Sequence, residues 1–83
     1  MAEQSENIAG LVESLVRPLV DFEDDVEVSS REEGSTIIVE FSVNEEDVGK
    51  VIGRQGRVIK SIRTLARAAA SRNDMHVEVE LLD

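Results

Sequence analysis

VIGRQGRVIK, residues 51–60, contains two glycines that are separated by only two residues. Apolar residues at helical spacing lie on both sides of this stretch, so we expect a tight turn between two helices. Gly53 can end the first helix in a left-handed conformation, and Gly56 lets the chain enter the next helix at once. A turn without Cβ atoms also lets another backbone approach closely, next to the unpaired N–H groups of a helix N-terminus.

Positive charge is concentrated around this turn, although the chain carries a net charge of −9. Residues 1–48 carry a net charge of −12, residues 49–72 carry +7 without a single acid, and residues 73–83 carry −4. This asymmetry predicts an anionic partner that binds one face of the protein. The candidate contact residues are those of the turn and its neighbours: Lys50, Ile52, Gly53, Arg54, Gln55, Gly56, Arg57, Lys60 and Arg63.

The helix expected over residues 57–71 separates its basic and apolar side chains. At about 100° per residue, its cations fall opposite an apolar stripe that we expect to face the sheet. The cations on the outer face are Arg57, Lys60, Arg63 and Arg67, and the stripe comprises Val58, Ile59, Ile62, Leu65, Ala66 and Ala69. For Arg67 and Arg72, an ordinary solvated helix face is an equally good interpretation.

The other elements follow from hydrophobic periodicity. Apolar residues at helical spacing predict a first helix over about residues 5–20, with a kink or early end at Pro18. Alternating residues predict strands over residues 26–31, 36–43 and 75–81, with a hairpin turn at Gly34. Asn44 is expected to cap a short second helix. The order helix–strand–strand–helix–helix–strand indicates an α+β two-layer sandwich, in which helices cover one face of a three-stranded sheet.

The composition argues against several classes of function. The chain has no cysteine and one histidine, so we expect no disulfide, no metal site and no cofactor. Its only aromatic residues, Phe22 and Phe41, are too few for a sheet that stacks bases on rings. A P-loop requires G-x-x-x-x-G-K-[ST] after a strand, which is absent. No catalytic pair of side chains is apparent, so an enzyme is not expected. No apolar run is long enough to span a membrane, and a cytoplasmic protein is the default expectation.

Residues 51–60 resemble the core motif of KH domains, in which a G-x-x-G loop clamps the backbone of about four nucleotides. The element order is similar to the type II form of that fold. The chain resembles the KhpA family of small bacterial RNA-binding proteins. The resemblance rests on this element order, on the stretch DVGKVIGRQGRVIKSIRTLARAAA and on the closing HVEVELLD. The resemblance implies a single KH domain over residues 1–83, with the first helix at about 5–20 and the KH core at about 26–82.

The same resemblance implies a role for each residue of the turn. Gly53 and Gly56 would admit the phosphodiester of single-stranded RNA. The side chains that contact or attract it would be Lys50, Arg54, Gln55, Arg57 and Lys60. Bases would lie in a groove between the two helices and an edge of the sheet, lined by Val48, Ile52, Val58 and Ile59. The family further implies an RNA chaperone that forms a homodimer, acts with a KhpB (Jag-type) partner and affects cell shape.

A protein-interaction module that does not bind RNA is the alternative. In that interpretation the G-x-x-G region forms a dimer contact, and the cations of residues 49–72 meet an acidic partner, such as the acidic part of a second copy. Ile38, an apolar residue expected on the outer face of its strand, gives a further indication of a covered surface.

Overall fold

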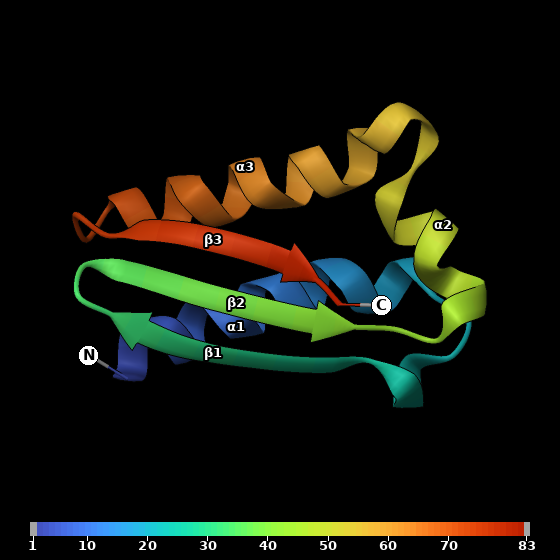
Figure 1. The fold of residues 1–83 in the computed structure, drawn as a ribbon, viewed down its shortest axis with the longest axis horizontal. Coiled ribbons are helices and arrows are strands. Elements are labelled where there is room, and N and C mark those ends of the chain that lie inside the picture. Colours follow the sequence, from blue (N-terminus) through green and yellow to red (C-terminus); the bar gives the residue numbers. More distant parts are fainter. Residues whose placement is uncertain (1, 83) are drawn as a thin grey trace.

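The fold is α+β, with a three-stranded sheet covered by helices on one face (Figure 1). The computed structural model describes residues 2–82. Its helices and strands are α1 (Ala2–Val16), β1 (Glu27–Glu33), β2 (Thr36–Ser42), α2 (Val48–Ile52), α3 (Arg57–Ser71) and β3 (His76–Leu81). Single turns of 3₁₀-helix precede β1, α2 and α3. The order of the elements is the one that the sequence predicts.

The first helix differs from the prediction in its bounds. α1 begins at Ala2 and ends at Val16, whereas residues 5–20 were expected. One turn of 3₁₀-helix, Arg17–Leu19, follows it and contains Pro18. Because proline lacks an N–H and crowds the preceding turn, the regular helix ends just before it. The early end predicted at Pro18 is therefore confirmed.

The sheet has the order β1-β2-β3, with β2 in the centre. β1 and β2 form an antiparallel hairpin whose turn contains Gly34 with a φ of 63°. β2 and β3 are parallel, and the connection between them runs through α2 and α3, as parallel pairing requires. Phe41 of β2 is opposite Leu81 of β3. The C-terminal ends of both strands consequently lie at the same edge of the molecule, on the side of α2 (Figure 1).

The core lies between the sheet and the two long helices. Every second residue of β2 is buried, namely Ile37, Val39 and Phe41. α1 contributes Ile8, Val12 and Val16 to the core, and α3 contributes Ile59, Ile62, Ala66 and Ala70. The opposite face of the sheet carries charged and polar side chains, and Ile38 is partly buried there. This alternation produces the two-layer arrangement that the sequence predicts.

Leu65 is the exception within the predicted stripe of α3, because half of its surface is exposed. The buried stripe follows Ile59, Ile62, Ala66 and Ala70. A step of about 100° per residue places Leu65 to one side of that stripe, next to Ala66. The prediction that Leu65 faces the sheet is therefore wrong, and an apolar side chain lies on the solvent side of α3.

Candidate nucleic-acid interface

The two glycines form a tight turn between α2 and α3, as expected. The N–H of Gly53 donates to the carbonyl of Gly49 at 2.9 Å, and the N–H of Gly56 donates to the carbonyl of Gly53 at 3.1 Å. Gly56 is left-handed, with φ 74° and ψ 16°, and Gln55 shares this region with φ 59°. Gly53 has a positive φ of 76°, but its ψ of 172° is extended, which differs from the left-handed cap that was predicted.

The two glycines are required for different reasons. A Cβ atom at Gly53 would lie 2.4 Å from Cγ2 and 2.9 Å from the backbone nitrogen of Val58. At Gly56 a Cβ atom would meet nothing within 4 Å. Only Gly56 therefore leaves open space for another molecule. Gly53 lets the first turn of α3 pack directly against the end of α2.

The lysine and arginine side chains outside residues 54–72 are neutralised by nearby acids. Arg17 forms an ion pair with Glu13, and Arg31 forms ion pairs with Glu33 and Glu40. Lys50 is held by two aspartates. By contrast, six cations in residues 54–72 form no ion pair with any acid whose side chain the structure describes: Arg54, Arg57, Lys60, Arg63, Arg67 and Arg72. Since residues 51–73 contain no acid, this positive charge is not compensated locally.

The unpaired charge is densest at the start of α3. Arg54, Arg57 and Lys60 are all exposed. A guanidinium nitrogen of Arg57 donates to Oε1 of Gln55 at 3.1 Å, which orients both side chains on the turn. Gly56 provides no side chain to cap α3, and the first turn of α3 contains no acid. The N–H of Arg57 donates to the carbonyl of Arg54. The positive end of the helix dipole, which no acid in the first turn offsets, favours an anion there.

Arg63 has a structural contact that the sequence did not predict. Its Nε donates to the carbonyl of Val79 at 3.1 Å, and the side chain is partly buried. Because β3 is an edge strand, this bond satisfies a backbone oxygen that no neighbouring strand reaches. Arg63 therefore ties α3 to the edge of the sheet, and it is less available to a ligand than Arg54 or Lys60.

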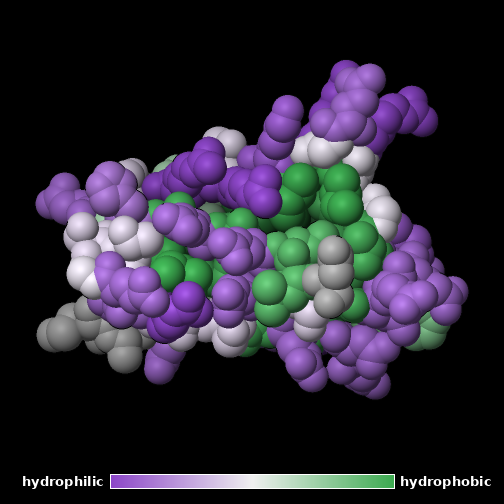
Figure 2. Space-filling model, in the orientation of Figure 1, coloured by the Kyte–Doolittle hydropathy of each residue, from purple (hydrophilic) through white to green (hydrophobic). Residues whose placement is uncertain are grey.

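The apolar residues expected to line a groove are only partly accessible. Ile59 is buried in the core and cannot contact a base, so that expectation is wrong. Val48 and Val58 are half-buried, whereas Ile52 is exposed at the end of α2. Figure 2 shows hydrophobic surface over the C-terminal ends of β2 and β3, where Leu82 is also exposed. Exposed aliphatic side chains are thus found at the end of α2 and after β3.

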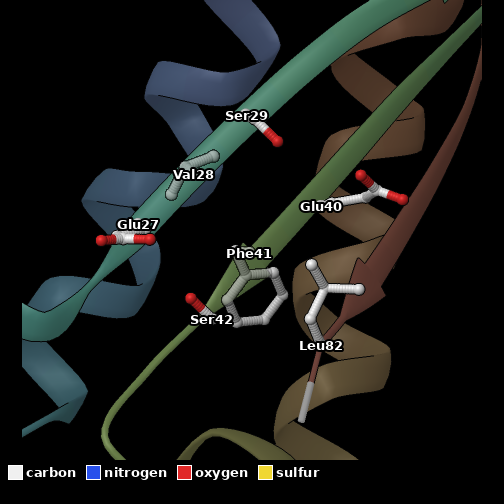
Figure 3. A pocket seen from close by; sticks show the side chains of 7 residues that line it. All are labelled: Glu27, Val28, Ser29, Glu40, Phe41, Ser42 and Leu82. Atoms are coloured by element: carbon white, nitrogen blue, oxygen red, sulfur yellow. The ribbon is translucent and has the colours of Figure 1, made fainter.

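A hollow of about 230 Å³ at the sheet does not have the chemistry for a polyanion. Its lining comes from β1, β2 and the residue after β3 (Figure 3): Glu27, Val28, Ser29, Glu40, Phe41, Ser42 and Leu82. Two carboxylates and no cation line it, so a phosphate would be repelled. A second hollow of similar volume contains Arg67 and His76, at the opposite end of α3 from the turn.

Asp47, directly before α2, is a buried charged residue. Its carboxylate accepts hydrogen bonds from the N–H groups of Asp21 and Phe22, at 3.1 and 3.0 Å, and from Nζ of Lys50 at 3.1 Å. Burial raises the pKa of Asp47, but these hydrogen bonds outweigh it and leave the pKa lowered. Nothing in the sequence distinguishes Asp47 from Glu45 and Glu46, which are exposed.

Asp21 also accepts a hydrogen bond from Nζ of Lys50, so this ammonium group bridges two carboxylates. The hydrogen bonds with Asp21 and then Asp47 raise the pKa of Lys50. Lys50 is thus near the turn, as expected, but its charge is balanced within the protein. Together, Asp21, Asp47 and Lys50 attach the connector after α1 to the start of α2.

Among residues 2–82, no cluster of acidic or histidine side chains could hold a metal ion. Within the same part of the chain, no helix combines the length and apolar character that are needed to cross a bilayer.

Comparison with known proteins identifies relatives over most of the chain. The family model described as "KhpA/KhpB, KH domain" matches residues 9–81. A protein of Listeria monocytogenes named RNA-binding protein KhpA is 42% identical over 73 residues, which are 88% of this chain and 96% of the relative. Proteins of the same name from Borreliella burgdorferi and Clostridium acetobutylicum are 44% and 46% identical, over 88% and 87% of this chain and 89% and 96% of the relatives.

Solved structures show the same fold. Era from Aquifex aeolicus superposes with a TM-score of 0.64 at 22% identity, covering 90% of this chain. An Era structure that contains a segment of 16S ribosomal RNA superposes with the same TM-score at 21% identity, over 89% of this chain. The chain spans only 29% and 28% of these two Era chains, and at this identity the likeness concerns the fold alone.

Proposed function

Because the chain belongs to the KhpA/KhpB KH-domain family, we propose that it binds single-stranded RNA at the turn Gly53–Gly56 and the first turn of α3. The observation that carries the proposal is a set of six cations in residues 54–72 that have no acidic partner among the side chains that the structure describes. The other three lysine and arginine side chains are all paired. The names of the relatives, which are RNA-binding proteins, support it.

The backbone of the RNA lies across Gly56, where the absence of a side chain leaves open space. Phosphate oxygens accept hydrogen bonds from the N–H groups at the start of α3. Arg54, Arg57 and Lys60 supply the charge, and Gln55 supplies a side-chain amide. Bases extend from the phosphates toward Ile52 and the aliphatic surface beside it. Aliphatic contacts replace aromatic stacking, since Phe41 is in the core.

The small number of contacts sets the expected affinity. About four phosphate contacts on a single strand give a slope of about −3 in a plot of log affinity against log salt concentration. We expect dissociation constants of roughly micromolar or weaker for one domain, because so few charges are engaged.

Replacement of Arg54 and Gln55 by aspartate tests the proposal. The double variant Arg54→Asp, Gln55→Asp should abolish binding of a labelled single-stranded RNA in an anisotropy titration and leave the circular dichroism spectrum unchanged. Arg72→Asp, Asn73→Asp makes the same change of net charge at the far end of α3 and should weaken binding only slightly. Wild-type affinity in the folded loop variant would show that the turn is not the binding site.

A finer part of the proposal concerns assembly. The resemblance to KhpA implies a homodimer, a KhpB-type partner and an RNA chaperone activity that affects cell shape. The exposed Leu65 on the outer side of α3 supports a protein contact there, since half of this large apolar side chain is in solvent. A dimer would link two weak RNA sites and raise the avidity for longer RNA.

A protein-interaction module without RNA binding is the competing function. In that case the loop variant would alter self-association, while RNA would not bind even to the wild-type protein. Sedimentation of the wild-type and loop variants with and without RNA separates the two functions.

A further inference from the structure

The contacts of Lys50 indicate how the affinity of the proposed RNA site is set. Lys50 is on α2, one turn before Gly53, and its ammonium group hydrogen-bonds to both Asp21 and Asp47. A cation in this position would otherwise add to the charge that faces a phosphate at the turn. The two carboxylates therefore hold an ammonium group that would otherwise be free to meet a phosphate.

Burial distinguishes the two carboxylates. The side chain of Asp47 is 0% exposed and also accepts two backbone N–H groups, so an RNA phosphate cannot replace it. The side chain of Asp21 is 74% exposed, and that of Lys50 is 44% exposed. An exposed ion pair contributes little to stability, because water solvates both partners and screens their attraction. The pair between Lys50 and Asp21 is thus the one that a phosphate can displace.

The backbone at Asp21 is nevertheless fixed in place. The N–H groups of Asp21 and Phe22 both donate to Asp47, which itself precedes α2. The connector therefore keeps the carboxylate of Asp21 within reach of Lys50 while leaving that carboxylate in solvent. This combination of a fixed backbone and an accessible side chain distinguishes Asp21 from Asp24, an exposed connector residue whose side chain forms no hydrogen bond or ion pair among the described residues.

We propose that Asp21 is an affinity-determining residue, whose carboxylate competes with the RNA phosphate for the ammonium group of Lys50. This inference rests on the proposed RNA-binding function and adds a residue to it. In the absence of RNA, Asp21 and Asp47 share Lys50. When RNA binds, a phosphate oxygen replaces the carboxylate of Asp21, while Asp47 keeps its hydrogen bond. The protein thereby limits its affinity for RNA, and removal of the competing carboxylate should increase it.

Asp21→Asn tests this inference with Asp24→Asn as the matched control, because both substitutions remove one negative charge from the same connector. Binding of a short fluorescein-labelled single-stranded RNA is measured by anisotropy over a series of salt concentrations. Asp21→Asn should bind roughly two- to fivefold more tightly, the range that an exposed ion pair contributes. Its log–log salt slope should become steeper by about 0.7, the value for one phosphate charge on a single strand. In the wild type the phosphate frees the Asp21 carboxylate, which takes up a cation from solution, whereas the variant has no such carboxylate. Asp24→Asn should show a smaller gain and no change of slope.

A double-substitution cycle with Lys50→Met shows whether the effect passes through Lys50. In the Lys50→Met background, the increase in RNA affinity caused by Asp21→Asn should fall to the increase caused by Asp24→Asn. Equal gains from the two asparagine variants in the wild-type background, or a full gain without Lys50, would overturn the inference. Both results differ from a failure of the proposed function, in which the wild-type protein does not bind or the loop variant binds normally. Circular dichroism verifies that each variant is folded.

Discussion

Substitution of Gly53 by alanine should destabilise the protein far more than the same change at Gly56. At Gly53, φ 76° with ψ 172° is a combination that is almost confined to glycine, and forcing another residue into it costs about 1–3 kcal/mol. The added Cβ would also lie 2.4 Å from Cγ2 of Val58 and 2.9 Å from its backbone nitrogen. Overpacking of this kind costs a further 1–3 kcal/mol or so.

The sum, about 2–6 kcal/mol, is a large part of the total stability of a small domain, which is about 0.05–0.15 kcal/mol per residue. Gly56→Ala adds a Cβ in open space, so it should cost only the left-handed backbone energy of about 1–2 kcal/mol. Gly10→Ala, within α1 and also in open space, should stabilise the protein by about 0.5–1 kcal/mol. The three variants make the same chemical change in three different environments.

Urea unfolding followed by far-ultraviolet circular dichroism is the suitable assay, because the chain contains no tryptophan or tyrosine. With a slope of about 1 kcal/mol per molar urea, Gly56→Ala should lower the midpoint by about 1–2 M. Gly53→Ala should lower it further or abolish the folded baseline.

The double variant Gly53→Ala, Val58→Ala gives a second measurement. It removes the contact with Cγ2 but keeps the strained φ and the contact with the backbone nitrogen, so it should recover only part of the loss. If Gly53→Ala costs no more than Gly56→Ala, then the contact between α2 and α3 does not require a glycine, and the packing argument is wrong.

The remaining predictions concern Asp47, Leu65 and Arg63. Because the pKa of Asp47 is lowered, the stability that its carboxylate provides is complete above the ordinary pKa of 3.8 and is lost as the pH falls through the lowered pKa. In urea titrations, Asp47→Asn should therefore be less stable than the wild type at neutral pH. Below about pH 4 the variant should lose less stability than the wild type does. Equal pH dependence in the two proteins would refute this. If the proposed homodimer forms through α3, Leu65→Lys should leave the melting temperature nearly unchanged and lower the sedimentation coefficient toward that of a monomer. An unchanged sedimentation coefficient would rule out Leu65 as part of the contact. Arg63→Met should lower the free energy of unfolding by about 1 kcal/mol, because the hydrogen bond to Val79 is lost. Lys60→Met, the control, should leave it nearly unchanged. Urea unfolding of both variants measures the difference.

The sequence was sufficient for the fold because its periodic signals agree with one another. The alternation in β2, interrupted only by Ile38, and the helical stripe of α3, wrong only at Leu65, indicate which side chains face the core. Gly34, Gly53 and Gly56 mark turns where the φ is positive. The boundaries of α1 were less predictable, since a helix end depends on local competition around Pro18.

The candidate site was predicted less completely, because the sequence identifies charged residues but not their partners. The turn and the exposed Arg54, Arg57 and Lys60 are where the pattern indicates. The roles of Asp47 and Lys50 could not be inferred, because their contacts join residues that are 25 to 29 positions apart in the chain. Likewise, a motif of two glycines does not show that Val58 occupies the space beside Gly53, whereas the space beside Gly56 is open.

An acidic protein can attract a polyanion at one face only if its charges are separated in space by more than the screening distance. The molecule measures 34 × 25 × 19 Å, and the Debye length at physiological salt is about 8 Å. The open face of the sheet, with Glu27, Glu40 and Glu80, is therefore largely screened from the turn beyond α2. Asp21 differs because its carboxylate is in direct contact with the ammonium group of Lys50, at a separation shorter than the Debye length. The distant acids should thus disfavour indiscriminate binding, whereas the carboxylate of Asp21 acts on the site itself. For that reason, removal of the Asp21 carboxylate should alter the salt dependence of RNA binding, and removal of the Asp24 carboxylate should not.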